Sequence, residues 1–435
     1  MAEDTARPRP SWGLQTTLVP LGTLALVVAL GRDGGHAVSP DADSYIAMAR
    51  GRFQDAFGPF SSRFLHPLIV FLLSRSGLST ERSFELVAIL SVAAFFLVAL
   101  ALWRRHSIST LLLFSPAVLL LAPWFVEFFR MYYHAELFHA AVCGLFFLAL
   151  PTRPRLSLLI LFVLFLVRES TILLALSVAA VALGRGRPRF ALATLGVAVL
   201  GWTVTSRVAA YAQPNIHHLG AALYLVAKVF HQFCSNILGL AFVVDKHAFY
   251  NEFTPKYVFN LPHWGILGGI TKLAFVRFDA RGPLETALAA LTTFGIFPLL
   301  FLRAGLFARF RQCAPAESIA LLYGTLCFVT APLLGNAISR YISYGWPALF
   351  IAAPALLPHF LPSQRWKRVA VSCVHLAICW LPEMFRGASP SLFRLAILVI
   401  VALLLNYFGY RLLTGYVPPA ASNAAETDSQ ALVYF

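Results

Sequence analysis

Charged residues are scarce in this chain. They make up 12% of its 435 residues, against about 25% in an ordinary soluble domain. Together with a hydrophobic content of 59%, this scarcity excludes a soluble globular enzyme and a disordered chain, because both need far more polar surface. The composition is typical of an integral membrane protein that crosses the bilayer many times.

Cysteines and acidic residues are also few. The six cysteines show no spacing typical of a disulfide framework or a zinc site. Only 19 acidic residues stand against 34 basic ones, which gives a net charge of +15. The basic residues lie mostly between apolar runs, where they set membrane orientation, so no nucleic-acid partner is expected. The sequence predicts no cofactor, although it does not exclude a divalent metal.

Long apolar runs predict an all-α, polytopic membrane protein with about twelve transmembrane helices. Residues 1–414 form one transmembrane domain in this prediction, and the polar residues 415–435 form a disordered cytoplasmic tail. The expected spans are 14–31, 83–103, 108–127, 135–150, 155–167, 170–183, 190–210, 284–302, 316–334, 342–361, 368–382 and 391–412.

The runs 155–167 and 170–183 have two interpretations, because each is short for a hydrocarbon core of about 30 Å. They form either a hairpin of two short helices or one long helix that contains Arg168 and Glu169. Only the hairpin places the basic residues of five connecting loops on one side of the membrane together with both termini. That side is the cytoplasm by the positive-inside rule, so the hairpin is favoured.

The outer face then carries a first loop at 32–82 and a long segment at 211–283. Residues 64–74 are apolar but too short to span, and we expect a helix at the membrane interface there. Residues 219–244 form either another interfacial helix or an additional crossing, and the charge pattern favours the interface. Arginine far outnumbers lysine, a bias common in GC-rich bacterial genomes, so the expected location is the bacterial inner membrane.

The first outside loop contains two acidic residues, Asp41 and Asp43, followed by Tyr45. Asp41 and Tyr45 are four residues apart and therefore share one face of a helix. Asp41 is either a capping acid on an interfacial helix or a functional carboxylate. Arg63 and His66 later in the same loop support the functional interpretation, because they place further polar groups at the same membrane depth.

A second polar group lies where the apolar run 108–127 ends. Arg130, His134 and Glu136 lie there, and charges at the end of a span need partners or a wet cavity. Glu127 is one turn from Arg130 and could pair with it. His134 and His139 are five residues apart, so they do not form the one-face pair of a zinc protease.

Two arginines interrupt later apolar runs. Arg168 and Glu169 form either a structural salt bridge or part of a functional site. Arg340 and Tyr341 lie at the outer mouth of a span that contains Pro347. They either anchor the span at the membrane interface or form an anion site. The planar fork of a guanidinium matches a phosphate, which makes these arginines candidate phosphate ligands.

These elements together resemble the C-type (GT-C) superfamily of membrane glycosyltransferases, which take a sugar from a polyprenyl-phosphate carrier. The resemblance is to the superfamily and not to a member defined by its substrate. It implies a polyprenyl-phosphate-linked sugar donor, a glycan or lipid acceptor and a catalytic aspartate in the first outside loop. The similar stretches are Asp41…Tyr45, Pro59-Phe-Ser-Ser-Arg63-Phe-Leu-His-Pro67, Arg168-Glu169-Ser170 and Arg340-Tyr341…Pro347.

The resemblance and the chemistry of transfer assign roles to these residues. The base that takes the proton of the acceptor hydroxyl is Asp41 or Asp43. The donor phosphate is bound by three arginines, Arg340, Arg168 and Arg63. Contacts with the sugar and acceptor are expected from Tyr45, His66, Arg130, His134, Glu136, Glu169 and Tyr341. A single carboxylate base with direct displacement predicts inversion at the anomeric carbon.

Two other functions stay open. A transporter or flippase for a lipid or small anion also carries buried Arg, Glu and His residues, but it spreads them through the bilayer. A non-catalytic subunit of a polysaccharide assembly machine is the second. The gathering of polar residues at one face, with a long first loop, favours an enzyme.

Overall fold

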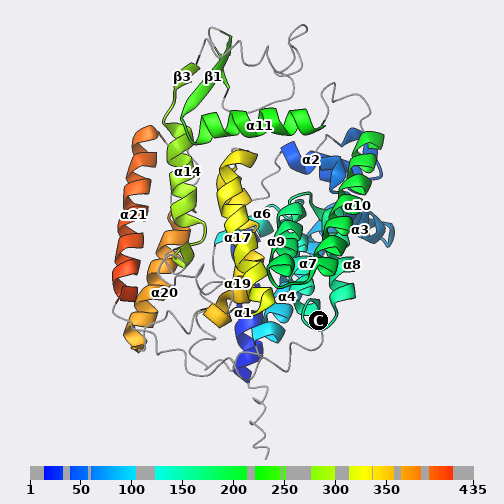
Figure 1. Cartoon of the computed structure of the whole chain (residues 1–435), viewed down its shortest axis with the longest axis horizontal. Coiled ribbons are helices and arrows are strands. Elements are labelled where there is room, and N and C mark those ends of the chain that lie inside the picture. The colour runs from blue at the N-terminus through cyan, green and yellow to red at the C-terminus, as the bar shows by residue number, and fades with distance from the viewer. Residues whose placement is uncertain are drawn as a thin grey trace, which may run out of the picture.

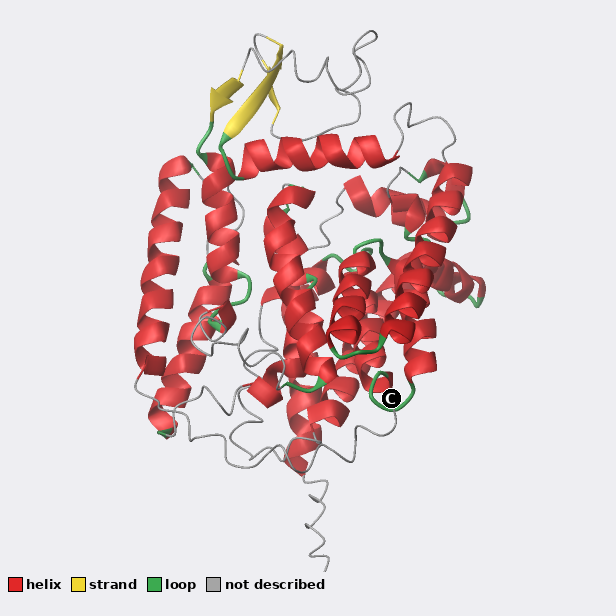
Figure 2. Cartoon of the chain, in the orientation of Figure 1, coloured by secondary structure: helices red, strands yellow, loops and turns green. Residues whose placement is uncertain are grey.

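The computed structural model describes residues 14–32, 40–56, 60–103, 123–212, 221–245, 248–250, 276–298, 313–335, 337–356, 364–383 and 391–414. This part of the chain is predominantly helical, as the composition predicts (Figure 2). The tail expected at 415–435 lies outside the described residues, as does most of the span expected at 108–127.

Four of the described helices are long and apolar enough to cross a membrane, which is the pattern of a membrane protein. α17 and α21 stand upright in Figure 1, and α21 exposes apolar side chains such as Leu403 and Leu404 along its length. The four helices are α4 (Thr80–Trp103), α10 (Pro188–Ala212), α17 (Pro315–Leu334) and α21 (Leu392–Thr414).

The expected count of about twelve spans is not confirmed within the described residues, because most of the apolar runs form shorter helices. The helices α7 (Glu136–Ala149), α8 (Pro154–Val167) and α9 (Thr171–Gly184) have 14 residues each. That length gives about 21 Å, less than a hydrocarbon core of about 30 Å. The remaining predicted runs contain α1 (Leu14–Arg32), α6 (Pro123–Arg130), α14 (Arg281–Thr292), α19 (Trp346–Leu356) and α20 (Arg365–Trp380).

The structure decides between the two interpretations of residues 155–183. Arg168 has an extended backbone (φ −161°, ψ 133°), so α8 ends before it and cannot continue into α9. α10 packs against both short helices. The run therefore forms two short helices and the single long helix is wrong, whereas the membrane topology expected from the hairpin stays a prediction.

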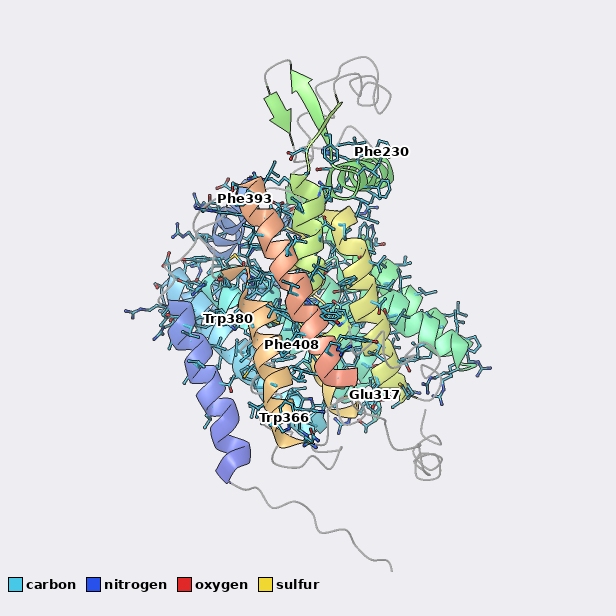
Figure 3. The ribbon with its side chains drawn as sticks, turned by 90° about the vertical axis from the view of Figure 1, so that its left-hand side faces the viewer. Phe230, Glu317, Trp366, Trp380, Phe393 and Phe408 are labelled. Atoms are coloured by element: carbon cyan, nitrogen blue, oxygen red, sulfur yellow. The ribbon has the colours of Figure 1, made fainter. Side chains whose placement is uncertain are left out.

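The helix α11 (Ala221–Asn236) is not part of the upright bundle. The helix α2 (Pro40–Ala49) is followed by the short turns η1 (Phe53–Asp55) and η2 (Phe60–Ser62) and by α3 (Leu65–Arg75), which packs against α2 and α4. In Figure 1 α11 lies across the ends of α14 and α17, and in Figure 3 it is seen end-on while α17 and α21 remain upright. This placement agrees with an interfacial helix and not with an additional crossing.

Residues 211–283 also contain a small antiparallel sheet, which the sequence pattern did not predict. Its order is β2-β1-β3, formed by β1 (Leu240–Asp245), β2 (Ala248–Tyr250) and β3 (Val276–Phe278). The apolar run that forms β1 reads as a continuation of the preceding helix. Gly239 separates the two with a positive φ of 67°, and a Cβ there would lie 2.9 Å from the Asp279 carbonyl oxygen.

Aromatic packing joins the helices α4, α6 and α19. The rings of Phe95 on α4, Phe125 on α6 and Phe350 on α19 are in mutual contact, with centroids 5.5–6.4 Å apart. Trp103 Nε1 donates to the carbonyl oxygen of Phe350 at 3.1 Å. After α17, the short helix α18 (Ile338–Ser343) folds back against it, so the chain re-enters the interior there.

Candidate active site

Five polar side chains from distant parts of the sequence meet at the end of the bundle where α2 lies (Figure 1). We call them the charged cluster. Asp41 comes from α2, His134 from the turn before α7, and Glu136 from the first residue of α7. Arg168 comes from the hairpin tip between α8 and α9, and Arg340 from α18. The sequence analysis predicted all five as site residues.

Arg340 is the centre of the charged cluster. Its Nε and Nη2 donate to Glu136 Oε1 at 2.8 and 2.6 Å, and its Nη1 donates to Asp41 Oδ2 at 3.2 Å. Nη2 also lies 2.9 Å from His134 Nδ1. A guanidinium only donates, so this ring nitrogen accepts and His134 carries its proton on Nε2. Burial lowers the pKa of His134 to about 4, despite the nearby Glu136 carboxylate, so the ring is neutral at pH 7.

Glu136 holds the two arginines side by side. Its Oε1 also accepts from Arg168 Nη1 at 2.7 Å, so one buried carboxylate oxygen bridges two guanidiniums that would otherwise repel each other. The Glu136 side chain is 1% exposed. This positioning role was not anticipated, and the expectation that Glu136 contacts a sugar stays a prediction.

The backbone break at Arg168 explains how a guanidinium reaches the interior. Because the helix stops there, the side chain is free to lie against α18 and the start of α7. Its Cζ lies 4.0 Å from the ring centroid of Tyr344, and Nη2 also donates to the Tyr344 hydroxyl. The sequence analysis did not name Tyr344 as a site residue. Its position one turn after Arg340 is the signal that could have found it.

Asp41 and Asp43 differ sharply in their surroundings. Asp41 is half-buried and paired with Arg340, whereas Asp43 is exposed on the other side of α2. Residues two positions apart on a helix point about 200° apart, so only one of the two aspartates can face the cluster. The aspartate that faces it is Asp41.

The charged cluster has a buried and an accessible side. The side chains are 1% exposed at Glu136, 19% at Arg340 and 31% at Asp41. The Arg340–Asp41 hydrogen bond is also longer than the two from Arg340 to Glu136. A ligand that approaches the cluster therefore meets the Asp41 contact first, and this contact is the easiest to exchange.

Arg63 forms a second cluster with Glu169 and Tyr45. Its Nε donates to Glu169 Oε2 at 2.7 Å, Nη2 donates to Oε1, and Nη1 donates to the Tyr45 hydroxyl at 3.0 Å. This bidentate pair joins the segment between α2 and α3 to the turn between α8 and α9. Tyr45 also packs edge-to-face on His134, with centroids 5.6 Å apart, which links the second cluster to the charged cluster. Arg63 is thus already occupied by a carboxylate, which favours a structural role over phosphate binding.

Replacing Glu169 with glutamine is expected to destabilise the protein by about 3–5 kcal/mol, because the buried Arg63 loses its counter-charge. Arg50 and Glu81 form an exposed pair and supply the control, where Glu81→Gln should cost at most about 1 kcal/mol. Unfolding of purified protein in detergent measures both. An equal, small effect of the two substitutions would contradict the structural role of Arg63.

The same pair predicts a pH dependence. Burial alone would raise the pKa of Glu169, but the Arg63 guanidinium outweighs it and lowers the pKa from 4.5 to about 2. The stabilisation is therefore complete above pH 4.5 and is lost as the pH falls toward 2. The stability difference between wild type and Glu169→Gln should shrink over this window.

Besides Asp43, three predicted residues lie outside both clusters. Arg130 binds Glu383 Oε2 at 3.4 Å and the carbonyl oxygen of Leu30 at 3.2 Å, so it joins the ends of α6, α1 and α20. His66 is buried between the rings of Phe84 and Phe138. Tyr341 packs edge-to-face on Tyr344, with centroids 5.7 Å apart. Their expected substrate contacts stay predictions.

No three His, Cys, Asp or Glu residues among those described are grouped so that they could hold a metal ion. No family model matches the chain, and comparisons with curated proteins and with solved structures gave no match either. The functional argument therefore rests on the geometry of the site.

Proposed function

We propose that this chain is a membrane glycosyltransferase of the GT-C type. It moves a sugar from a polyprenyl-phosphate donor to a hydroxyl of a glycan or lipid acceptor on the outer face of the bacterial inner membrane. Both termini are cytoplasmic in this proposal. The observation that carries it is the half-buried carboxylate of Asp41 beside two bridged guanidiniums, Arg168 and Arg340, at one end of a bundle with candidate membrane spans.

The transfer needs one base and one cationic site. The acceptor hydroxyl oxygen forms a bond to the anomeric carbon while the bond from that carbon to the phosphate oxygen breaks. The acceptor proton moves to Asp41, and the electron pair of the broken bond stays on the lipid phosphate. Direct displacement in one step inverts the anomeric configuration. The leaving phosphate gains charge, which Arg340 and Arg168 stabilise.

Donor binding and base release are coupled in this scheme. Without a donor, Arg340 Nη1 is held by Asp41. A phosphate that takes Nη1 displaces the carboxylate, which then becomes free to accept a proton. Glu136 keeps the two guanidiniums in place during the exchange, because its contacts are shorter than that of Asp41 and its own side chain is buried. The planar fork and permanent charge of an arginine allow it to bind Glu136 and, at the same time, either Asp41 or a phosphate.

The proposal is tested with the purified protein reconstituted in liposomes and a panel of radiolabelled polyprenyl-phosphate sugars. A membrane extract supplies the acceptors. We expect transfer from one member of the panel, with an inverted anomeric linkage in the product. Retention of configuration would contradict the single-step mechanism. Binding of the lipid phosphate without transfer from any donor would favour a flippase or transporter.

A further inference from the structure

The second half of α11, residues 228–236, is amphipathic in the reverse of the usual sense. Among these residues the exposed side chains are apolar, with Phe230 at 49% and Phe233 at 40% exposure. The buried side chains are Cys234 and three polar residues, Gln232, Ser235 and Asn236, at 6% exposure or less. In water the hydrophobic effect drives the opposite arrangement, so an exposed apolar edge of this kind marks a contact surface.

Hydrogen bonds fix α11 in this orientation. The side-chain amide of Asn236 donates to the carbonyl oxygens of Pro332 and Gly335, at 2.7 and 3.1 Å, where α17 ends. It also donates to Gln232 Oε1 at 3.0 Å, and Thr286 on α14 donates to the Asn236 carbonyl oxygen at 2.9 Å. These buried bonds would be lost if α11 rotated its apolar edge inward.

The apolar edge lies at the end of the molecule where a candidate span, α21, begins. α11 packs on α14, which packs on α21. Phe393 at the start of α21 is 74% exposed, and Tyr211 near the end of α10 is 76% exposed. Figure 3 shows Phe230 and Phe393 at the same end of the molecule and Trp366 at the other. Exposed aromatic residues at the two ends of membrane spans are typical of the two bilayer interfaces.

We propose that α11 inserts its apolar edge into the boundary between headgroups and acyl chains in the leaflet at this end of the bundle. A helix that lies across the ends of the spans, with an apolar outer edge, has the geometry of an interfacial helix. The occupant is lipid, because the exposed Phe230 lies at the same end of the molecule as the exposed Phe393, with which a candidate membrane span begins.

The insertion has a consequence for the charged cluster. Asn236 binds the carbonyl groups that end α17, and Arg340 follows Gly335 by five residues. Because α11 is bonded to the end of α17, its depth in the leaflet fixes the depth of Arg340 in the membrane. Arg340 then lies at the level of the lipid phosphates. This consequence rests on the proposed function, whereas the lipid contact of α11 does not.

Spin labels test the lipid contact without any turnover. Labels are attached at Phe230→Cys and Phe233→Cys in full-length protein in liposomes, after serine replacement of Cys313 and Cys373, the cysteines that are not buried. Collision rates with oxygen, which concentrates in lipid, and with a water-soluble nickel chelate are then compared. Leu404→Cys on α21 gives the deep lipid reference, and Arg52→Cys in the first outside loop gives the aqueous one.

The proposal predicts oxygen-to-nickel collision ratios at both α11 positions that lie between those of the two reference labels. Ratios equal to that of the Arg52 label would overturn it, since the edge would then face water. Labels at Phe230 and Phe233 that neither reagent reaches would also overturn it, because a protein partner would then cover the edge. Failure of sugar transfer would leave these ratios unchanged, so the two proposals fail separately.

Discussion

Replacing Asp41 with asparagine is expected to reduce sugar transfer by about 10²–10⁴-fold, the range for loss of a general base. The same change at Asp43 should alter the rate by no more than about twofold, as at most exposed positions. Both substitutions remove one negative charge from α2 two residues apart, so Asp43→Asn controls for charge and for folding. Initial rates in liposomes measure the difference.

The contrast between the two variants follows from the geometry. The side-chain amide introduced by Asp41→Asn would still present an oxygen to Arg340, so the cluster should keep its shape while losing the group that accepts a proton. Asp43 is exposed and lies on the other side of α2. Loss of transfer in Asp43→Asn with retention in Asp41→Asn would reverse the assignment, and retention in both would refute a catalytic role for this loop.

Replacing Arg340 with lysine is expected to reduce transfer by about 10²–10³-fold, the cost of losing a donor to developing negative charge. Lysine keeps the charge but not the fork, so one ammonium cannot serve both Glu136 and a phosphate. Arg394→Lys at the start of α21 is the matched control, because Arg394 is exposed at the same end of the molecule. Its transfer rate should stay within about twofold of wild type.

The loss in Arg340→Lys should appear in kcat as well as in the donor KM. A residue that only holds the fold would lower the amount of active protein without changing either constant. Arg168 stays paired with Glu136 in this variant, so the positive charge at the site is maintained. If kcat and the donor KM are unchanged in Arg340→Lys, the guanidinium of Arg340 has no role in the transfer.

The sequence predicted which segments contain the polar residues, but it did not predict which of these residues bind each other. Hydropathy located the two short helices on either side of Arg168 and the helix near 64–74, because this signal is local. The partners of Arg340 are 204 residues away at Glu136 and 299 residues away at Asp41. No periodicity carries contacts over such separations.

Two further features depend on details finer than a hydropathy pattern. Asp41 and Asp43 are chemically equal in the sequence, and only the rotation of α2 distinguishes them. The sequence did not indicate that both oxygens of Glu169 accept from Arg63, and phosphate binding by Arg63 stays a prediction. The strand β1 was not predicted, because its apolar residues fit a helix as well as a strand. The sequence signal for the boundary between α11 and β1 is Gly239.

The central claim is that a lipid phosphate binds Arg340 in competition with Asp41. Equilibrium binding of radiolabelled polyprenyl phosphate to wild type, Asp41→Asn and Arg340→Lys tests it most directly. The account predicts binding roughly tenfold tighter in Asp41→Asn, a gain of about 1.4 kcal/mol from removing the competing carboxylate, and weaker binding in Arg340→Lys. Equal affinity in all three proteins would contradict it.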